Sequence, residues 1–371
     1  SVDDKNERGQ TALYCAARRG HIEIVRELLQ LNADVSAVNE KGSSPLHTAA
    51  YNNRAEILQL LIDHVTNANQ EERLSSAHPS PQPGVVAAAT AAGFAAAPAL
   101  TMPASAAGVA AEMAAASARG QADPFIDKPN SLGQSPLYLA ARNGHDACLQ
   151  VLLMAKADPN RRLVGKRQSG RECGSTPLHG AAWQNQENCV RLLLQGGASA
   201  AMRQEDTGFT PRFEILHEAT PDTGRAHQTS PPLASASAAR VNIVAMLENA
   251  EREEFVALAA KGDLHGLKTL LESEGLLEAM MESTSLGLAE TMSEGRTALI
   301  AAASQNRLDC VQYLLDHASN INTKGDEGMT ALHMAASCGL PAVTKLLLER
   351  GADTTMQTDD GNSLQEIADP S

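Results

Sequence analysis

A short pattern of polar and apolar positions recurs along the chain and predicts a series of short helices. Each copy begins with Thr or Ser, has Leu two positions later, and ends in a pair of alanines. A hydroxyl side chain before an apolar run is a common N-cap, and Pro is well tolerated in the first helical turn. The copies that align without gaps are TALYCAA from Thr11, SPLHTAA from Ser44, SPLYLAA from Ser135, TPLHGAA from Thr176, TALIAAA from Thr297 and TALHMAA from Thr330.

Each copy is followed by signals for a turn and a second helix. Three residues after the alanine pair stands Gly or Asn, the residue types that best tolerate the left-handed conformation at a helix end. Further on lies an apolar pair with the spacing of a buried helical stripe. These pairs are Leu28-Leu29, Leu61-Ile62, Leu152-Leu153, Leu193-Leu194, Leu314-Leu315 and Leu347-Leu348. The pattern predicts helix–turn–helix units, each followed by a polar loop such as Asn39-Glu40-Lys41-Gly42, here called the finger.

The spacing of the units resembles that of a known repeat family. A glycine stands two positions before each copy, and Gly9 and Gly42 are 33 positions apart, as are Gly295 and Gly328. This period, together with TPLHGAA from Thr176, resembles the ankyrin repeat. The resemblance implies an all-α ankyrin-repeat solenoid, in which stacked helix–turn–helix units carry short β-hairpin finger loops.

Breaks in the spacing predict insertions and degenerate units. One tract rich in Ala, Pro, Ser and Gly has the composition of a disordered linker. The segment around Phe255 keeps the phase of a repeat but lacks its motif. The expected organisation is ankyrin repeats 1 and 2 at 1–65, a disordered insertion at 66–121, repeats 3 and 4 at 122–206 with a basic finger insertion at 161–171, two degenerate repeats with loops at 207–291, and two repeats with a C-terminal cap at 292–371.

Charge and cysteine usage narrow the class of protein. The net charge is −14, of which residues 1–203 carry +1 and residues 204–371 carry −15, so nonspecific nucleic-acid binding is disfavoured.

Six cysteines without a CxxC pair indicate a reducing compartment, and we expect the cytoplasm, with the nucleus as an open alternative. No apolar run reaches the roughly 18 residues of a membrane span. The start at Ser1 rather than Met leads us to expect a piece of a longer chain.

The sequence lacks the common motifs of catalysis and cofactor binding. Phosphate-binding loops and nucleophile elbows are absent, and His217-Glu218 lacks the second His of a zinc-protease motif. Cys173, His179 and Cys189 are candidate metal ligands, but Cys189 stands in the repeat position of a small buried hydrophobe. We therefore expect no enzyme activity, catalytic residue, metal or cofactor in this chain.

The ankyrin resemblance implies that partners bind the fingertips and the two residues after each alanine pair. In the first four units these pairs include Tyr, Trp and Arg, which are the most frequent interface hot spots. Two alternatives to partner binding are open. The Trp side chain can pack on the neighbouring unit, and the Arg side chains can simply be solvated. The expected binding residues are Arg18, Arg19, Tyr51, Asn52, Arg142, Asn143, Arg161, Arg162, Lys166, Arg167, Trp183 and Gln184.

These features favour a non-catalytic protein-interaction module, a scaffold or adaptor that acts as a monomer and binds an acidic, partly apolar protein segment. The insertion at 66–121 is a candidate internal competitor for the same surface. The alternative is a targeting or regulatory region of a larger signalling enzyme whose catalytic domain lies outside these residues. Recognition of phosphate or RNA by the basic finger is a third hypothesis, weakened by the lack of interleaved aromatic residues for base stacking.

Overall fold

The computed structural model of the chain describes residues 1–76, 125–164, 174–205, 208–217, 238–271, 292–293, 296–317 and 320–368. These residues form two compact units, one of residues 1–198 and 203–208, the other of residues 199–202 and 209–371. Most of the insertion expected at 66–121 and most of the basic finger insertion lie outside the described residues. None of the helices in the described stretches is long and apolar enough to cross a membrane.

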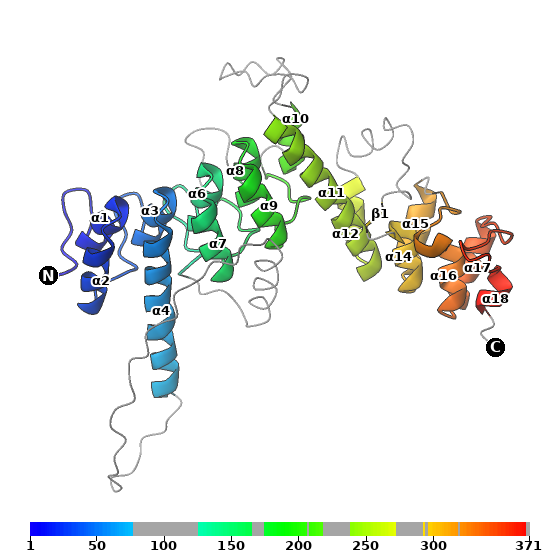
Figure 1. The fold of residues 1–371 in the computed structure, drawn as a ribbon, viewed down its shortest axis with the longest axis horizontal. Coiled ribbons are helices and arrows are strands. Elements are labelled where there is room, and N and C mark those ends of the chain that lie inside the picture. The colour runs from blue at the N-terminus through cyan, green and yellow to red at the C-terminus, as the bar shows by residue number, and fades with distance from the viewer. Residues whose placement is uncertain are drawn as a thin grey trace, which may run out of the picture. The chain divides into compact units, whose positions relative to one another are not determined.

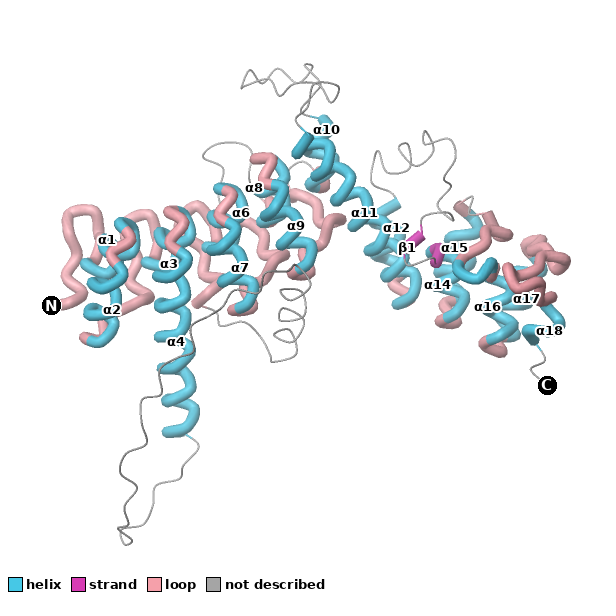
Figure 2. The backbone as a smooth tube through the Cα atoms, in the orientation of Figure 1, coloured by secondary structure: helices cyan, strands magenta, loops and turns pink. Residues whose placement is uncertain are grey.

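The first unit is a stack of helix pairs (Figures 1 and 2). The first helices of the pairs contact one another in chain order, and so do the second helices. This is the expected arrangement of a solenoid, in which each repeat contacts its neighbours. The pairs are α1 (Ala12–Arg19) with α2 (Ile22–Gln30), α3 (Pro45–Tyr51) with α4 (Ala55–Ser76), α6 (Pro136–Asn143) with α7 (Asp146–Met154), and α8 (Pro177–Trp183) with α9 (Glu187–Gln195).

The hydroxyl residues at the start of the motif cap the first helices as predicted. Thr11 Oγ1 accepts a hydrogen bond from Tyr14 N at 3.2 Å, and Ser135 Oγ accepts one from Tyr138 N at 3.2 Å. Where the fourth motif position is His, its ring bonds back to the cap, which makes a capping box of the kind otherwise made by Glu or Gln. The start of each such helix is therefore fixed by residues within one turn of it.

The predicted turn residues all have the left-handed backbone conformation. The φ angles are 84° at Gly20, 56° at Asn53, 74° at Gly144 and 55° at Asn185, and the equivalent Asn306 and Gly339 in the second unit have 57° and 64°. Short Gly and Asn side chains adopt this conformation with little strain.

Replacing Gly144 with Val is expected to lower the free energy of unfolding by roughly 1–3 kcal/mol, because a β-branched residue is strained at positive φ. The Cβ of any replacement also meets the side chain of Gln186, within 2.2 Å of its Oε1. Gly144→Asn is the matched control, since Asn holds this position in other repeats and adds a Cβ without the same backbone cost. Urea denaturation should rank wild type, Asn and Val in that order, and equal costs for Asn and Val would contradict the backbone explanation.

The core of the first unit is made by the motif leucines and the apolar pairs of the second helices. Leu13, Leu46, Leu137 and Leu178 have no exposed surface. In each of the second helices α4, α7 and α9, one residue of the apolar pair is fully buried, such as Leu152 in α7. The paired alanines are almost fully buried as well, so they allow neighbouring first helices to pack closely. The core is thus a continuous thin layer between first and second helices.

The second unit begins with less regular helices and ends with two regular repeats. A short antiparallel pair, β1 (Met292–Ser293) with β2 (Arg296–Thr297), precedes the regular part. One cluster of buried apolar residues runs from Phe255 to Leu347. The helices are α10 (Pro211–His217), α11 (Ala238–Lys261), α12 (Leu264–Leu271), α14 (Ala298–Ser304), α15 (Leu308–Asp316), the 3-10 turn η3 (Asp326–Gly328), α16 (Ala331–Ser337), α17 (Pro341–Glu349) and the terminal α18 (Leu364–Ala368).

Two helices are longer than the sequence pattern predicts. Helix α4 continues to Ser76, so residues 66–76, which we assigned to a disordered insertion, are helical; Figure 1 shows this extension beyond its neighbours. Helix α11 runs without a break through 241–261, although we expected two separate degenerate repeats within 207–291 and therefore a turn before the unit around Phe255. The segment Glu248-Asn249-Ala250 contains no Gly or Pro, so the helix continues.

Candidate partner-binding groove

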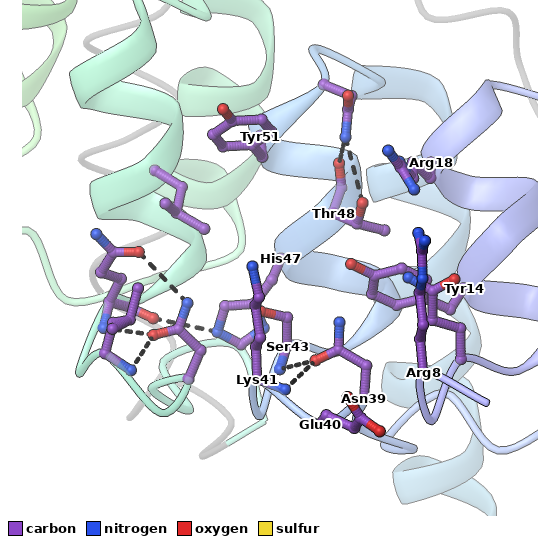
Figure 3. Close-up of a pocket in the computed structure, with 16 residues that line it drawn as sticks. Arg8, Tyr14, Arg18, Asn39, Glu40, Lys41, Ser43, His47, Thr48 and Tyr51 are labelled. Atoms are coloured by element: carbon purple, nitrogen blue, oxygen red, sulfur yellow. Dashed lines mark hydrogen bonds between the residues drawn. The ribbon is translucent and has the colours of Figure 1, made fainter. Parts of the chain in front are cut away.

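A groove of about 740 Å³ lies along the finger side of the first three repeats. One wall is formed by the last turns of first helices, with Arg18 from α1 and Tyr51 from α3. The opposite wall is formed by the fingers, with Arg8, Lys41 and Leu132. Figure 3 shows the labelled residues of both walls facing the same space.

An Asn side chain closes the turn in each of the three fingers that border the groove. Asn39 Oδ1 accepts hydrogen bonds from the backbone N of Lys41 and of Ser43, at 2.9 and 3.0 Å. The Asn130 and Asn6 side chains make the same pair of bonds in their own fingers. Such Asx turns fix the backbone through a local side chain. The amide oxygens are therefore used within the fingers, and the charged residues at the tips remain to contact a partner.

The floor of the groove is held by a buried histidine that connects two repeats. His47 Nδ1 lies 2.8 Å from Ser44 Oγ, and its Nε2 lies 3.2 Å from the carbonyl oxygen of Gln134 in the next finger. Burial lowers the pKa of His47 to about 4, so the ring is neutral at physiological pH. His333 makes the equivalent link in the second unit, with Nε2 3.1 Å from the Met356 carbonyl. His47 and His333 are therefore structural residues that connect neighbouring parts of the stack.

The groove carries an excess of positive charge. Arg8, Arg18 and Lys41 line it, and Glu40 is the acidic residue among the lining side chains. These three basic side chains form no ion pair with any residue in the described part of the chain. Unpaired cations on both walls of a narrow groove favour an anionic ligand group between them.

The groove gathers some of the predicted binding residues and not others. Arg18, Tyr51 and Asn52 line it. Asn52 and Asn143 each donate from Nδ2 to a carbonyl of their own helix at 2.8 Å, so their amides are already used. Arg19 is exposed outside the groove.

The remaining predicted residues lie further along the first unit. Trp183 and Arg142 are half-buried, and Arg142 packs near Gly180 of α8. Gln184 is exposed, and Arg161 and Arg162 are half-buried, with Arg162 Nη1 3.6 Å from Glu205 Oε1. These residues are not among those that line the groove. Lys166 and Arg167 lie outside the described residues, so their part in binding stays a prediction.

We predicted the fingertips as a binding surface, but our list of binding residues included none from the first three fingers. Arg8, Lys41 and Leu132 each stand directly before a finger glycine, at Gly9, Gly42 and Gly133. Taking that one position from every unit, in addition to the pair after the alanines, would have found them. Tyr14, which is nearly buried and lines the groove from α1, had no signal distinguishing it from a core residue.

The cysteines considered as metal ligands have other surroundings. Cys189 is buried, and its Sγ donates to Asp146 Oδ1 at 3.0 Å, while His179 is used in the cap of α8. Burial raises the pKa of the equivalent Cys148 to about 12, so its thiol stays protonated. Cys173 lies outside the described residues. Both described thiols behave as small core side chains.

Comparison with known sequences decides the family. A model of ankyrin repeats in three copies matches residues 1–72 and 255–358, and a model of the single ankyrin repeat matches residues 132–162 and 173–204. The chain belongs to the ankyrin-repeat family. Ankyrin repeats are non-catalytic and serve protein–protein interaction, which supports the protein-binding part of our prediction.

The chain is similar to several curated proteins of different kinds. The chain is similar to the E3 ubiquitin-protein ligase KEG of Arabidopsis thaliana, with 25% identity over 99% of this chain and 18% of the ligase. It is 31% identical to human ankyrin repeat and SOCS box protein 3, over 53% of this chain and 32% of that protein. It is 33% identical to human protein phosphatase 1 regulatory subunit 27, over 23% of this chain and 55% of the subunit. The chain thus spans less than a third of the first two relatives.

Proposed function

We propose that the first unit binds an extended acidic segment of a partner protein in the groove between its first helices and its fingers, here called the finger groove. The observation that carries the proposal is the arrangement of Arg8, Arg18 and Lys41 around one groove, without ion pairs to described residues and with Glu40 as the acidic residue among the lining side chains. A carboxylate entering this space gains from several cations at once. The protein then acts as a non-catalytic adaptor whose specificity is set by this unit.

The exposed apolar residues of the groove indicate the rest of the ligand. Tyr51 is 55% exposed and Leu132 is 56% exposed, on opposite walls. Large apolar side chains that are half exposed beside basic groups are typical of interface hot spots, because their burial adds to the electrostatic attraction. The ligand segment therefore combines acidic residues with at least one apolar side chain.

A quantitative pull-down from native, nuclease-treated extract tests the proposal. The bait is the full chain, compared with a Tyr51→Ala/Leu132→Ala variant and with a Val241→Ala/Leu348→Ala control, whose residues are 49% and 45% exposed in the second unit. We expect specific proteins to be depleted by the groove variant and retained by the control, with both variants folded by circular dichroism. Equal retention by both variants would show that this groove is not the binding surface.

A second candidate function is the targeting region of a larger signalling enzyme. The observation in its favour is similarity to an E3 ubiquitin-protein ligase across 99% of this chain, although that ligase is far longer. An antibody against the described repeats distinguishes the two on an immunoblot of native extract. A band far above 39.0 kDa supports the larger protein, and a band near that mass supports a separate adaptor.

A further inference from the structure

The chemistry of the finger groove changes from one repeat to the next. Each of the first three repeats contributes the residue directly before its finger glycine, together with side chains from its first helix. In the first repeat these include Arg8 on the finger and Arg18 on α1, so both walls are cationic there. Figure 3 shows this pair at one end of the groove, with Lys41 further along. An acidic side chain is therefore favoured at the first repeat.

The second repeat is mixed in character, and the third is apolar. Lys41 and Tyr51 line opposite walls in the second repeat. In the third repeat the lining includes Leu132, which is 56% exposed, and Leu139 of α6. As far as the chain is described, the residues that line the groove from this repeat carry no charge. A ligand segment that lies along the groove thus meets two cationic repeats and then an apolar one.

The stacking of the repeats sets the distance between these positions. Helix α1 packs on α3, and α3 packs on α6. The fingers follow the same repeat, because Glu40 N donates to the Arg8 carbonyl at 3.4 Å and Ser131 N donates to the Lys41 carbonyl at 3.0 Å. Packed helices are roughly 8–10 Å apart, so equivalent side chains of successive repeats are separated by about 9 Å.

A polyproline II helix matches this separation. It has three residues per turn and rises about 3.1 Å per residue, so every third side chain lies on one face, roughly 9 Å from the next. A β-strand places the side chains of one face about 6.7 Å apart, since every second residue points the same way. Neighbours on one face of an α-helix are about 5–6 Å apart. A polyproline II segment therefore presents one side chain to each repeat.

We infer that the ligand of the finger groove is a polyproline II segment of a separate protein with the pattern acidic-x-x-acidic-x-x-apolar. The first acidic side chain binds between Arg8 and Arg18, the second binds beside Lys41, and the apolar side chain packs on Leu132. The inference rests on the proposed function and adds the conformation and the residue spacing of the ligand. The pattern holds for either chain direction, because every third side chain shares a face whichever end lies at the first repeat. Proline between the anchors reduces the entropy lost on binding.

Synthetic peptides of one composition test the spacing. The pattern peptide is Glu-Pro-Pro-Glu-Pro-Pro-Leu, and the shifted peptide is Glu-Pro-Glu-Pro-Pro-Pro-Leu, each made in both sequence directions with capped ends and a fluorescent label. Fluorescence anisotropy with the full chain measures their affinities. We expect the pattern peptide, in one of its two directions, to bind at least about 10-fold more tightly than either shifted peptide. Equal affinities, or no measurable binding of the pattern peptide, would overturn the inference.

Double-mutant cycles test the register of the ligand. In the matched cycle, Leu132→Ala is combined with a peptide whose Leu is replaced by Ala. In the crossed cycle, the same variant is combined with a peptide whose outer Glu is replaced by Gln. Residues in contact couple and distant residues add, so we expect at least about 3-fold coupling in the matched cycle and less than about 1.5-fold in the crossed one. Similar coupling in both cycles would contradict the register.

The Leu132→Ala variant is suited to this test because the side chain is exposed in the free protein, so its loss leaves the fold unchanged by circular dichroism. The pull-down with Tyr51→Ala/Leu132→Ala separates the inference from the proposed function. Partners that this variant loses, combined with peptides whose spacing makes no difference, would retain the groove as the binding surface and reject the polyproline II ligand. A variant that loses no partner would reject both.

Discussion

Reversing two charges of the finger groove, in an Arg18→Glu/Lys41→Glu variant, is expected to weaken partner binding by roughly 100-fold. The two side chains lie on opposite walls of the groove and have no described ion-pair partner, so each reversal replaces an attraction with a repulsion. Like charges brought together in an interface cost several kcal/mol, and about 2.7 kcal/mol already gives this factor. Fluorescence anisotropy of the labelled partner segment measures the change, and wild-type affinity should fall with added salt.

A control with the same total charge separates local from global effects. Arg19→Glu/Lys345→Glu changes the net charge by the same amount, and both residues lie outside the groove, Arg19 one position along the same helix. We expect this control to weaken binding no more than about 3-fold. Equal losses in both double variants would mean that only the overall charge matters. Unchanged binding in the groove variant would place the ligand elsewhere.

Most of the regular fold follows from local signals in the sequence. A cap such as Thr11 and a turn residue such as Gly20 act on their own helix. The start and the end of each first helix can therefore be predicted from residues that lie within about ten positions of one another. The irregular helix α11 could not be predicted this way. The repeat phase was inferred from the segment around Phe255, whereas the continuity of the helix depends on the residues between the two units. The extension of α4 was missed because the Ala-, Pro- and Ser-rich composition of the residues after Ser76 led us to assign all of 66–121 to a disordered insertion.

The candidate site was only partly predictable because it depends on contacts between units. Tyr51 and Arg18 were found from their positions after the alanine pairs. Lys41 comes from a loop whose direction is set by Asn39 and by bonds to the next finger, and a helix-based alignment carries no information on it. Trp183 has the residue type of a hot spot but stands one repeat beyond the groove. Residue type and helix position therefore identify candidates, and packing selects among them.

A buried carboxyl in the second unit gives the other large expected effect. Glu251 of α11 is 4% exposed, and Arg212 Nε from α10 lies 2.7 Å from its Oε2. Burial raises the pKa of Glu251 to about 7, and the attraction of Arg212 offsets this only in part. A hydrogen bond from the Thr210 side chain also lowers this pKa, whereas the nearby charge of Glu248 raises it. The charged carboxylate is thus poorly solvated where the long helix α11 meets α10.

The sign of the pH dependence follows from this shift. Between about pH 4.5 and 7 the folded unit keeps the Glu251 proton that the unfolded chain has released, so the free energy of unfolding falls as pH rises through that range. The total loss is on the order of 3 kcal/mol. His47 in the first unit acts in the opposite direction: its lowered pKa makes that unit less stable as pH falls from about 6.5 to 4.

Glu251→Gln is therefore expected to stabilise the second unit by about 3 kcal/mol well above pH 7 and to change it little near pH 4.5, because Gln resembles the protonated side chain. Hydrogen exchange of α10 and α11 across this pH range measures the effect without assuming that both units unfold together. Glu253→Gln on the same helix is the control, since Glu253 is exposed and is not among the groups that shift the pKa of Glu251. A Glu251→Gln variant that destabilises the unit at every pH would show that the ion pair with Arg212 outweighs the cost of burying the charge.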